Sequence, residues 1–296
     1  VYIVEDHYIL RSRPYESDTP VRFVSECKLC NDVAELTGFR FPEYLQSASG
    51  NYFVIDSGCF WTLHQLIPGQ PLGSWFELHK IDSVVNRQVL NVLRQLHKKT
   101  TGCFSENLIN RRRLLELVMP SMVEAPYFLS TKALGRVQRA FKSVENYCMS
   151  YPADECCFVH GDFHHGNILA QNGRIVGFVD LDWCRASNIY EDLAFTLMML
   201  LRDYLHWSHV FSESEYRKIL GYYGFSGDFG LLNDHLILYA LFDCIVFKLS
   251  QFENSTAFFE YQKRFVEELC RCLPKVSDPS KWKSCKKAVE IGMKGH

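Results

Sequence analysis

The chain has 296 residues, 47% of them hydrophobic, so it is long enough to bury a sizeable core as one large domain or two lobes. Its formal net charge is −2, and this near balance argues against a protein that binds nucleic acid or docks on an anionic membrane. The sharpest basic cluster, residues 111–113, is three arginines at an expected helix start, a pattern typical of a solvated face.

Hydrophobic patterning divides the chain into two parts. In roughly the first sixty residues, short β-like runs alternate with one helix, which we expect from about Pro20 to Leu36. From about Leu72 onward helical periodicity dominates, apart from one hairpin. The sequence therefore predicts a small mixed lobe followed by a large helical lobe.

Cysteines are frequent, with 12 in the chain. The close pairs are Cys27 with Cys30, Cys156 with Cys157, and Cys270 with Cys272. Such pairs do not make a disulfide ladder and no signal peptide is visible, so we expect reduced thiols in a cytoplasmic protein. Cys27 and Cys30 have the spacing of half a zinc site, but no suitable second pair follows nearby, which favours thiols without a metal.

A β-hairpin is expected between residues 168 and 179. Asn172-Gly173 is the strongest two-residue turn signal, and it lies between the apolar runs 168–170 and 175–179. The next long apolar runs, residues 193–201 and 236–249, are shorter than the roughly twenty residues that a membrane span needs. We expect both runs to form buried core helices.

The hairpin brings two oxygen ligands together. Counting outward from the turn places Asn167 opposite Phe178, so that Asp180 becomes the diagonal neighbour of Asn167 on the same face, roughly 7 Å away. Both side chains offer hard oxygen atoms, and Mg²⁺ at a nucleotide site is usually held by one or two such groups together with phosphate and water. The pair therefore predicts a magnesium clamp.

Asp162 precedes this clamp by five residues and follows the apolar run 156–159. On that loop a general base could meet a substrate hydroxyl. Any one of these three polar residues alone is most often a turn former or a solvated cap. Three at this spacing around an Asn-Gly hairpin match the arrangement that kinase-type phosphoryl transfer needs.

Residues 160–167, His-Gly-Asp-Phe-His-His-Gly-Asn, together with Asp180, resemble the aminoglycoside phosphotransferase and choline kinase-like family. Its members share the protein-kinase fold and phosphorylate mostly small-molecule hydroxyls. The resemblance implies an α+β, two-lobed kinase-like fold with ATP and Mg²⁺ as cofactors. It also implies a partial, nucleotide-binding N-lobe over residues 1–66 and a mainly helical C-lobe over residues 67–296, with the catalytic loop and the acceptor site.

Carried over residue by residue, the resemblance gives each polar group of the loop a role. Asp162 would be the base or the acid that positions the hydroxyl, and Asn167 and Asp180 would hold Mg²⁺. Asp182 would be a further acid beside the metal, and His160 would brace the loop by hydrogen bonding. Three more residues complete the region: Asp192 as the acid that steadies the loop from beneath, and His164 and His165 at variable loop positions where satisfied or exposed histidines are expected.

The resemblance also assigns the nucleotide-binding residues. Arg11, in a run that resembles the third strand of the family, occupies the place of the cation that pairs with phosphate, and Glu26 resembles the helix Glu that pairs with this cation. Residues 62–72 resemble the hinge between the lobes, where Gln65 is a candidate nucleotide contact. In this family a strand and a Gly-containing phosphate loop precede the strand that we expect at residues 1–4. We therefore expect a truncated or processed product, in which restoring the preceding residues would tighten ATP binding.

Two departures from the protein-kinase sequence pattern narrow the class of molecule that accepts the phosphate. Gly161 stands where protein kinases have the Arg of His-Arg-Asp, and only about ten residues separate Asp180 from the next helix, too few for a long activation loop. Both features favour a small-molecule hydroxyl over a protein. The acceptor would lie beside residues of the catalytic loop and the C-terminal helices, with these candidates chosen by position and residue type: Trp183, Arg185, Asp203, Tyr239 and Asp243.

Other functions stay open at this point. A nucleotide-binding or scaffolding relative that has lost catalysis fits the missing phosphate loop, but a scaffold has no need of all three polar residues. A kinase acting on protein Ser or Thr is a further alternative. A two-metal phosphoesterase would need additional Asp and Asn-His ligands, and no Gly-Asn-His occurs in the sequence. The sequence indicates neither an oligomeric state nor a choice between ATP and GTP.

Overall fold

The computed structural model describes residues 1–16, 19–73, 83–105, 109–201, 211–249 and 255–276. Its residues group into two compact units. Unit 1 comprises Val1–Leu78, Gln95–Asn110 and Pro152–Asp192, and unit 2 comprises His79–Arg94, Arg111–Tyr151 and Leu193–His296. Unit 1 thus adds the hairpin and the catalytic loop to the first part of the chain, and the expected lobe boundary at residues 66 and 67 stays a prediction.

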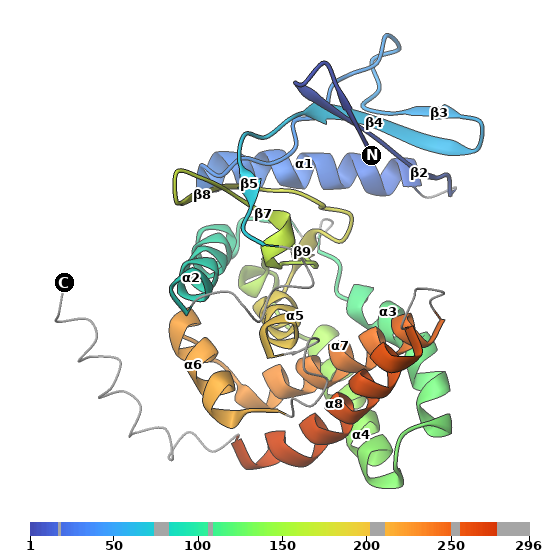
Figure 1. Cartoon of the computed structure of the whole chain (residues 1–296), viewed down its shortest axis with the longest axis vertical. Coiled ribbons are helices and arrows are strands. Elements are labelled where there is room, and N and C mark those ends of the chain that lie inside the picture. The colour runs from blue at the N-terminus through green and yellow to red at the C-terminus, as the bar shows by residue number, and fades with distance from the viewer. Residues whose placement is uncertain (17–18, 74–82, 106–108, 202–210, 250–254, 277–296) are drawn as a thin grey trace, which may run out of the picture. The chain divides into compact units, whose positions relative to one another are not determined.

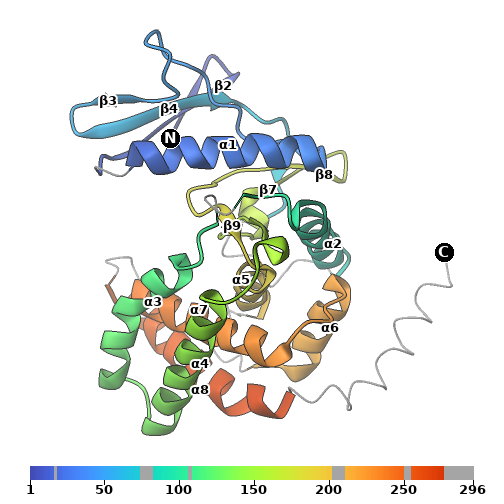
Figure 2. The same cartoon turned by 180° about the vertical axis from the view of Figure 1, so that it is seen from behind.

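Unit 1 contains a four-stranded antiparallel sheet in the order β1-β2-β4-β3. Its strands are β1 (Tyr2–Val4), β2 (Tyr8–Pro14), β3 (Val54–Asp56) and β4 (Cys59–Gln65). Helix α1 (Thr19–Thr37) runs along one face of this sheet, as Figures 1 and 2 both show, and it confirms the helix expected at residues 20–36. The core between them is built on Phe23 and Phe60, which are buried and meet edge to face at 5.2 Å.

Two smaller sheets also lie among the described residues of unit 1. Strand β5 (Gln70–Pro71), β7 (Ile168–Gln171) and β8 (Arg174–Phe178) form one, and β6 (Cys157–Val159) pairs with β9 (Arg185–Ser187) in the other. The predicted hairpin is confirmed as β7 and β8. Asn172 and Gly173 both have positive φ, 51° and 73°, as a tight two-residue hairpin turn requires.

The register of this hairpin differs from the sequence-based expectation by one residue. Ile168, not Asn167, lies opposite Phe178. The expected pairing of Asn167 with Phe178 is therefore wrong. The backbone carbonyl of Asn167 instead accepts a hydrogen bond from Val179 N–H at 3.0 Å. Because Val179 immediately precedes Asp180, the two expected metal ligands still begin from adjoining backbone.

A β-bulge causes the shift. Strand β8 carries one extra residue, Val176, between its pairs with Leu169 and Ala170. The backbone of Arg40 pairs with the bulged residue: the N–H of Arg40 donates to Val176 O at 3.0 Å. A Cβ at Gly177 would come within 2.5 Å of Arg40 O, so this close approach requires a glycine.

Unit 2 is helical. Its helices are α3 (Arg113–Glu124), the short η3 (Ala125–Tyr127), α4 (Thr131–Cys148), α6 (Glu213–Tyr223), α7 (Phe229–Leu249) and α8 (Ser255–Val276). Helices α2 (Ser83–Thr100) and α5 (Ile189–Leu201) each have residues in both units. Helix α7 packs against α3, α4 and α8 (Figure 2). Its stretch Phe229–Val246 is long and apolar enough to cross a membrane, but 72% of that stretch is buried, as expected for a core helix.

The 11 cysteines within the described residues are free thiols. Cys27 and Cys30 both lie on α1, and the sulfur of Cys30 is 3.8 Å from that of Cys184. Among the described residues, no group of three His, Cys, Asp or Glu side chains is arranged to hold a metal ion. Both cysteines of the pair on α1 are buried and belong to the packed core of unit 1.

Candidate active site

Asp192 fixes the backbone of the loop that carries the candidate catalytic residues. It lies at the start of α5, and its two carboxylate oxygens accept hydrogen bonds from the backbone N–H groups of His160 and Gly161, each at 2.7 Å. His97 Nε2 lies 3.4 Å from the same carboxylate. Burial alone would raise the pKa of Asp192, but these hydrogen bonds offset that effect and hold the pKa below its ordinary value. The acid expected to steady the loop thus makes the expected contacts.

His160 braces the loop through its side chain. The ring is fully buried, its Nδ1 accepts the Asp162 N–H at 3.3 Å, and its Nε2 lies 3.1 Å from Val179 O. This assignment places the proton on Nε2. Burial lowers the pKa of His160 below its ordinary value, which keeps the ring neutral. The side chain thus ties the loop to the residue before Asp180, in agreement with the bracing role expected from the sequence.

Gly161 leaves no room for a side chain. Its φ is +81°, and a Cβ at this position would lie 2.5 Å from Trp183 O. The arginine that protein kinases carry here could not be accommodated. The glycine at this place in the motif therefore follows from close packing of the loop against the segment after Asp182.

Asp162 and Asn167 are joined directly. Asn167 Nδ2 donates to the backbone carbonyl of Asp162 at 3.0 Å and to its Oδ2 at 2.9 Å. Burial raises the pKa of Asp162, but contacts with His164, His160 and Asn167 outweigh it, so the pKa lies below the ordinary value. Asp162 is therefore ionised at neutral pH and oriented by its neighbours.

Arg11 joins the two acids that follow the hairpin. Its Nη2 lies 3.0 Å from Asp180 Oδ1 and 2.7 Å from Asp182 Oδ2, and its Nη1 lies 3.1 Å from Asp182 Oδ1. Asp180 has a φ of 59°, so the chain leaves the extended conformation at this residue. The structure thus brings together Arg11, Asp180 and Asp182.

Glu26 pairs with Arg13 and with Arg22, whose Nε lies 3.6 Å from its carboxylate, and not with Arg11 as expected. Glu26 lies 3.9 Å from Arg13 Nη2, and the other end of Arg13 reaches Asp182 at 3.3 Å. The guanidinium of Arg13 is also placed over the ring of Phe60, 5.0 Å from its centre, which carries the side chain toward α1. Arg13 was not predicted as a site residue. The alternation of β2 was the available signal, because residues i and i+2 of a strand share a face and Arg13 therefore lies on the face of Arg11.

No described interaction joins Gln65 to these side chains. It is the exposed last residue of β4 and lines a cavity of about 660 Å³ together with residues of α1 and of the segment 39–44. No contact of the Gln65 side chain with the acids or arginines occurs among the described interactions. Its assignment to nucleotide binding stays a prediction.

The acceptor candidates are only partly described. The Arg185 guanidinium is buried against Glu191 and donates to Trp183 O at 2.6 Å, so its contacts are internal to the fold. Tyr239 is 2% exposed on α7, and Asp243 of the same helix bonds to Gln262 of α8. Asp203 lies outside the described residues. Arg185 and Tyr239 are thus built into the interior of their units.

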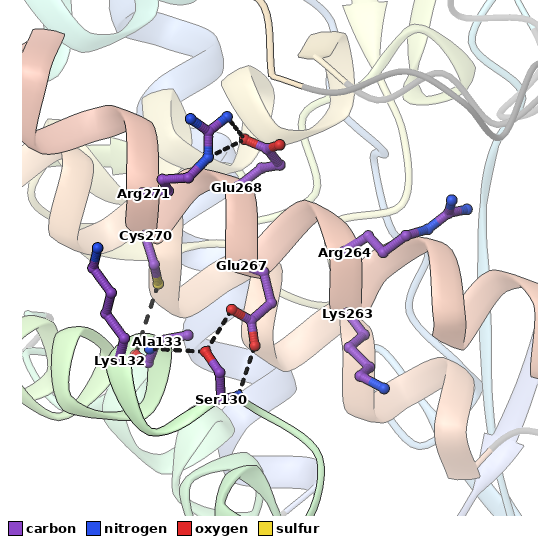
Figure 3. A pocket seen from close by; sticks show the side chains of 9 residues that line it. All are labelled: Ser130, Lys132, Ala133, Lys263, Arg264, Glu267, Glu268, Cys270 and Arg271. Carbon is purple, nitrogen blue, oxygen red and sulfur yellow. Dashed lines mark hydrogen bonds and ion pairs between the residues drawn. The ribbon is translucent and has the colours of Figure 1, made fainter.

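A separate hollow of about 400 Å³ lies in unit 2 (Figure 3). It is formed between the start of α4 and helix α8. Glu267 accepts hydrogen bonds from the N–H and Oγ of Ser130, both at 2.7 Å, and Arg271 pairs with Glu268. Because these polar groups satisfy one another, the arrangement secures the first turn of α4. It contains none of the predicted site residues.

A buried histidine next to the catalytic loop should make folding pH-dependent. His165 is 1% exposed, and burial lowers its pKa from 6.5 to about 4. Between these values the unfolded chain binds a proton here that the folded chain does not. Stability should therefore decrease as the pH is lowered from 6.5 toward 4, by up to about 1.4 kcal/mol per pH unit. Urea unfolding at several pH values should show a shallower fall for His165→Gln.

The matched control is His7→Gln, because His7 is exposed in the turn after β1. This control should leave the pH dependence of stability unchanged. Parallel stability curves for the native chain and His165→Gln would contradict the burial argument.

Comparison with known proteins identifies the family. The family model for the phosphotransferase enzyme family matches residues 1–232. Among the curated proteins, none matches this sequence. Solved structures resemble the fold, including the GDP and kanamycin complex of APH(2")-IIia, with a TM-score of 0.64 and 13% identity over 90% of this chain and 88% of that one.

Two further similar structures are kinases of small molecules. The amicoumacin kinase hAmiN, in complex with AMP-PNP, Ca²⁺ and Ami, has a TM-score of 0.59 and 14% identity over 88% of this chain and 81% of that one. The aminoglycoside phosphotransferase APH(3'')-Id from Streptomyces rimosus, in complex with ADP and streptomycin, has a TM-score of 0.54 and 16% identity over 80% and 87%. The fold is accordingly the kinase-like fold expected from the sequence, with a small antiparallel sheet and a mainly helical remainder. The chain belongs to the phosphotransferase enzyme family.

Proposed function

We propose that this phosphotransferase moves the γ-phosphate of ATP to a hydroxyl group of a small molecule, with Mg²⁺ at the nucleotide. One observation carries the proposal: Asn167 makes a contact on each side of the site. Its side chain donates a hydrogen bond to the carboxylate of Asp162, and its backbone carbonyl accepts one from Val179, the residue before Asp180. The hydroxyl-orienting acid and the two metal ligands that phosphoryl transfer needs therefore come from adjoining backbone.

Asp162 is assigned the role of binding the acceptor hydroxyl. Its depressed pKa makes it a weak base at neutral pH, so its main contribution is to orient the hydroxyl and to accept the proton as the new bond forms. The side chain is 25% exposed, which leaves it accessible to a substrate. His160 is excluded as the proton acceptor, because both of its ring nitrogens are committed to the backbone.

Asn167 and Asp180 are assigned the role of metal ligands, and Asp182 is a further acid beside the metal. The Nδ2 of Asn167 donates to Asp162, so the Oδ1 of Asn167 faces away from Asp162. Within the described residues this oxygen accepts no hydrogen bond, and the side chain of Asp180 is 43% exposed. An amide oxygen and one or two carboxylates suit Mg²⁺, which takes its remaining ligands from phosphate and water. When bound, the ion would neutralise phosphate charge during transfer.

Arg11 and Arg13 are assigned the role of binding the phosphates of the nucleotide. In the structure they neutralise Asp180 and Asp182, so a cationic strand already faces the proposed metal ligands. Glu26 fixes the orientation of Arg13, and Gln65 stays a proposed nucleotide contact at the end of β4. Support for nucleotide binding comes from the similar structures, which hold GDP, AMP-PNP and ADP.

A small acceptor fits the segment after the metal ligands. Only residues 183–188 separate Asp182 from α5, and three of them form β9, which is paired with β6. No peptide-docking loop of the protein-kinase type fits in this segment. The similar structures hold kanamycin and streptomycin, which supports a polyhydroxylated small molecule as the acceptor.

Calorimetric titration tests the nucleotide site first. We expect ATP or GTP to bind the chain in a Mg²⁺-dependent way and Asp180→Ala to lose that dependence. Asp154 is exposed on the short 3-10 helix η4 (Ala153–Glu155), so the control variant Asp154→Ala should bind nucleotide as the native chain does. A screen with radiolabelled nucleotide and hydroxylated acceptors, beginning with kanamycin and streptomycin, then tests transfer. Nucleotide binding without transfer to any acceptor would favour a non-catalytic relative.

A further inference from the structure

His164 lies next to the proposed hydroxyl-orienting acid and is 9% exposed. Its Nδ1 accepts the backbone N–H of Gly166 at 3.0 Å. A neutral imidazole that accepts at Nδ1 carries its proton on Nε2. The Nε2 lies 3.6 Å from Asp162 Oδ2. The ring therefore directs an N–H group at the carboxylate, at a distance longer than an ordinary hydrogen bond.

The two oxygens of Asp162 have different surroundings. Oδ2 is approached from two sides, by Asn167 Nδ2 at 2.9 Å and by His164 Nε2. Within the described part of the chain, Oδ1 receives no hydrogen bond. The hydrogen bond from Asn167 and the longer approach of the His164 N–H act on the same oxygen, so both favour one rotation of the carboxylate and leave Oδ1 for a hydroxyl.

Gly166 makes room for the histidine ring. A Cβ at this position would lie 2.9 Å from Cε1 and 3.1 Å from Nδ1 of His164. The φ of Gly166 is not in the left-handed region, so the requirement for glycine comes from this contact and not from backbone strain. The same residue thus supplies the N–H that selects the tautomer and the space that the ring occupies.

We propose that His164 is a positioning residue for phosphoryl transfer, which holds Asp162 so that one carboxylate oxygen faces the acceptor hydroxyl. This role rests on the proposed function of the site. It differs from the sequence-based expectation, in which this histidine was only a satisfied or exposed residue of a variable loop. Because His164 acts through Asp162, its loss should affect the transfer step and not nucleotide binding.

The kinetic test uses two independent changes and their combination. His164→Leu removes the N–H group, and Gly166→Ala displaces the ring without altering it. Each should lower kcat by about tenfold to a hundredfold, with KM for Mg·ATP unchanged. The double variant should be no slower than the slower single variant, because both changes remove one contact. His164→Gln, which restores an N–H donor, should recover part of kcat.

The matched control for Gly166→Ala is Gly221→Ala on α6, where an added Cβ would meet nothing within 4 Å. It should leave kcat unchanged. Multiplying effects in the double variant would overturn the proposal, because two unrelated defects multiply. A change in KM for Mg·ATP as large as the change in kcat would overturn it as well.

A second readout does not depend on an acceptor. In spectra of the ¹⁵N-histidine-labelled chain, His164 should appear as the Nε2–H tautomer, assigned by the loss of its signals in His164→Leu. Gly166→Ala should change these signals, and an Nδ1–H tautomer would overturn the proposal. A native chain that transfers no phosphate would overturn the proposed function, and this role with it. Unchanged kcat in His164→Leu beside an active native chain would overturn this role alone.

Discussion

Asp162→Asn should reduce the rate of phosphoryl transfer by about 10²- to 10⁴-fold while the affinity for Mg·ATP changes little. The amide keeps the shape of the carboxylate but loses its charge, so it cannot accept the hydroxyl proton. Its hydrogen bond with Asn167 Nδ2 can be kept through the amide oxygen. Single-turnover transfer to the acceptor and calorimetric titration with Mg·ATP separate the chemical step from binding.

Asp154→Asn is the matched control, because it is the same substitution at an exposed position of unit 1, on the 3-10 helix η4. It should leave both the transfer rate and the affinity unchanged. Turnover retained by Asp162→Asn would remove Asp162 from the proposed role. Weakened Mg·ATP binding of the same size as the rate loss would instead place Asp162 among the metal-binding groups.

Local signals in the sequence were sufficient for the elements that position the site. The Asn-Gly dipeptide predicted the hairpin because few other residues adopt two successive positive φ values. Helix α1 was predicted by periodicity to within one residue at each end. The hairpin register was missed, because the bulge at Val176 depends on the backbone of Arg40, a residue distant in sequence.

The residues around the site were predicted less completely than the motif itself. The motif placed Asp162, Asn167 and Asp180, but the contacts among side chains depend on which neighbours reach them. Two arginines on the same face of β2 compete for the same acids, and the position of Phe60 under Arg13 decides which one meets Glu26. Such a choice is made by packing between β4 and α1, which alternation along one strand does not reveal.

Glu191→Ala should be among the most destabilising single changes in unit 1. Glu191 is fully buried and pairs with Arg185, and it also accepts from Ser187 Oγ at 2.5 Å. Its removal leaves the Arg185 charge buried without its partner, which typically costs about 3–5 kcal/mol. The loss should appear as a lower urea midpoint. Trp183 offers a local fluorescence reporter, because Arg185 holds its backbone carbonyl.

Glu213→Ala is the matched control, since Glu213 also pairs with an arginine, Arg217, but on the exposed face of α6. An exposed i,i+4 pair contributes at most about 1 kcal/mol, so its loss should shift the midpoint little. Equal shifts in the two variants would contradict the burial argument.

The double variant Arg185→Leu with Glu191→Leu separates the cost of an unpaired charge from the value of the pair itself. Buried ion pairs replaced by apolar side chains lose little stability, because desolvation of the charges is relieved together with their attraction. The double variant should therefore be more stable than Glu191→Ala. It should still fall below the native chain, because Arg185 also donates to Trp183 O and thereby holds the segment against which Gly161 is packed.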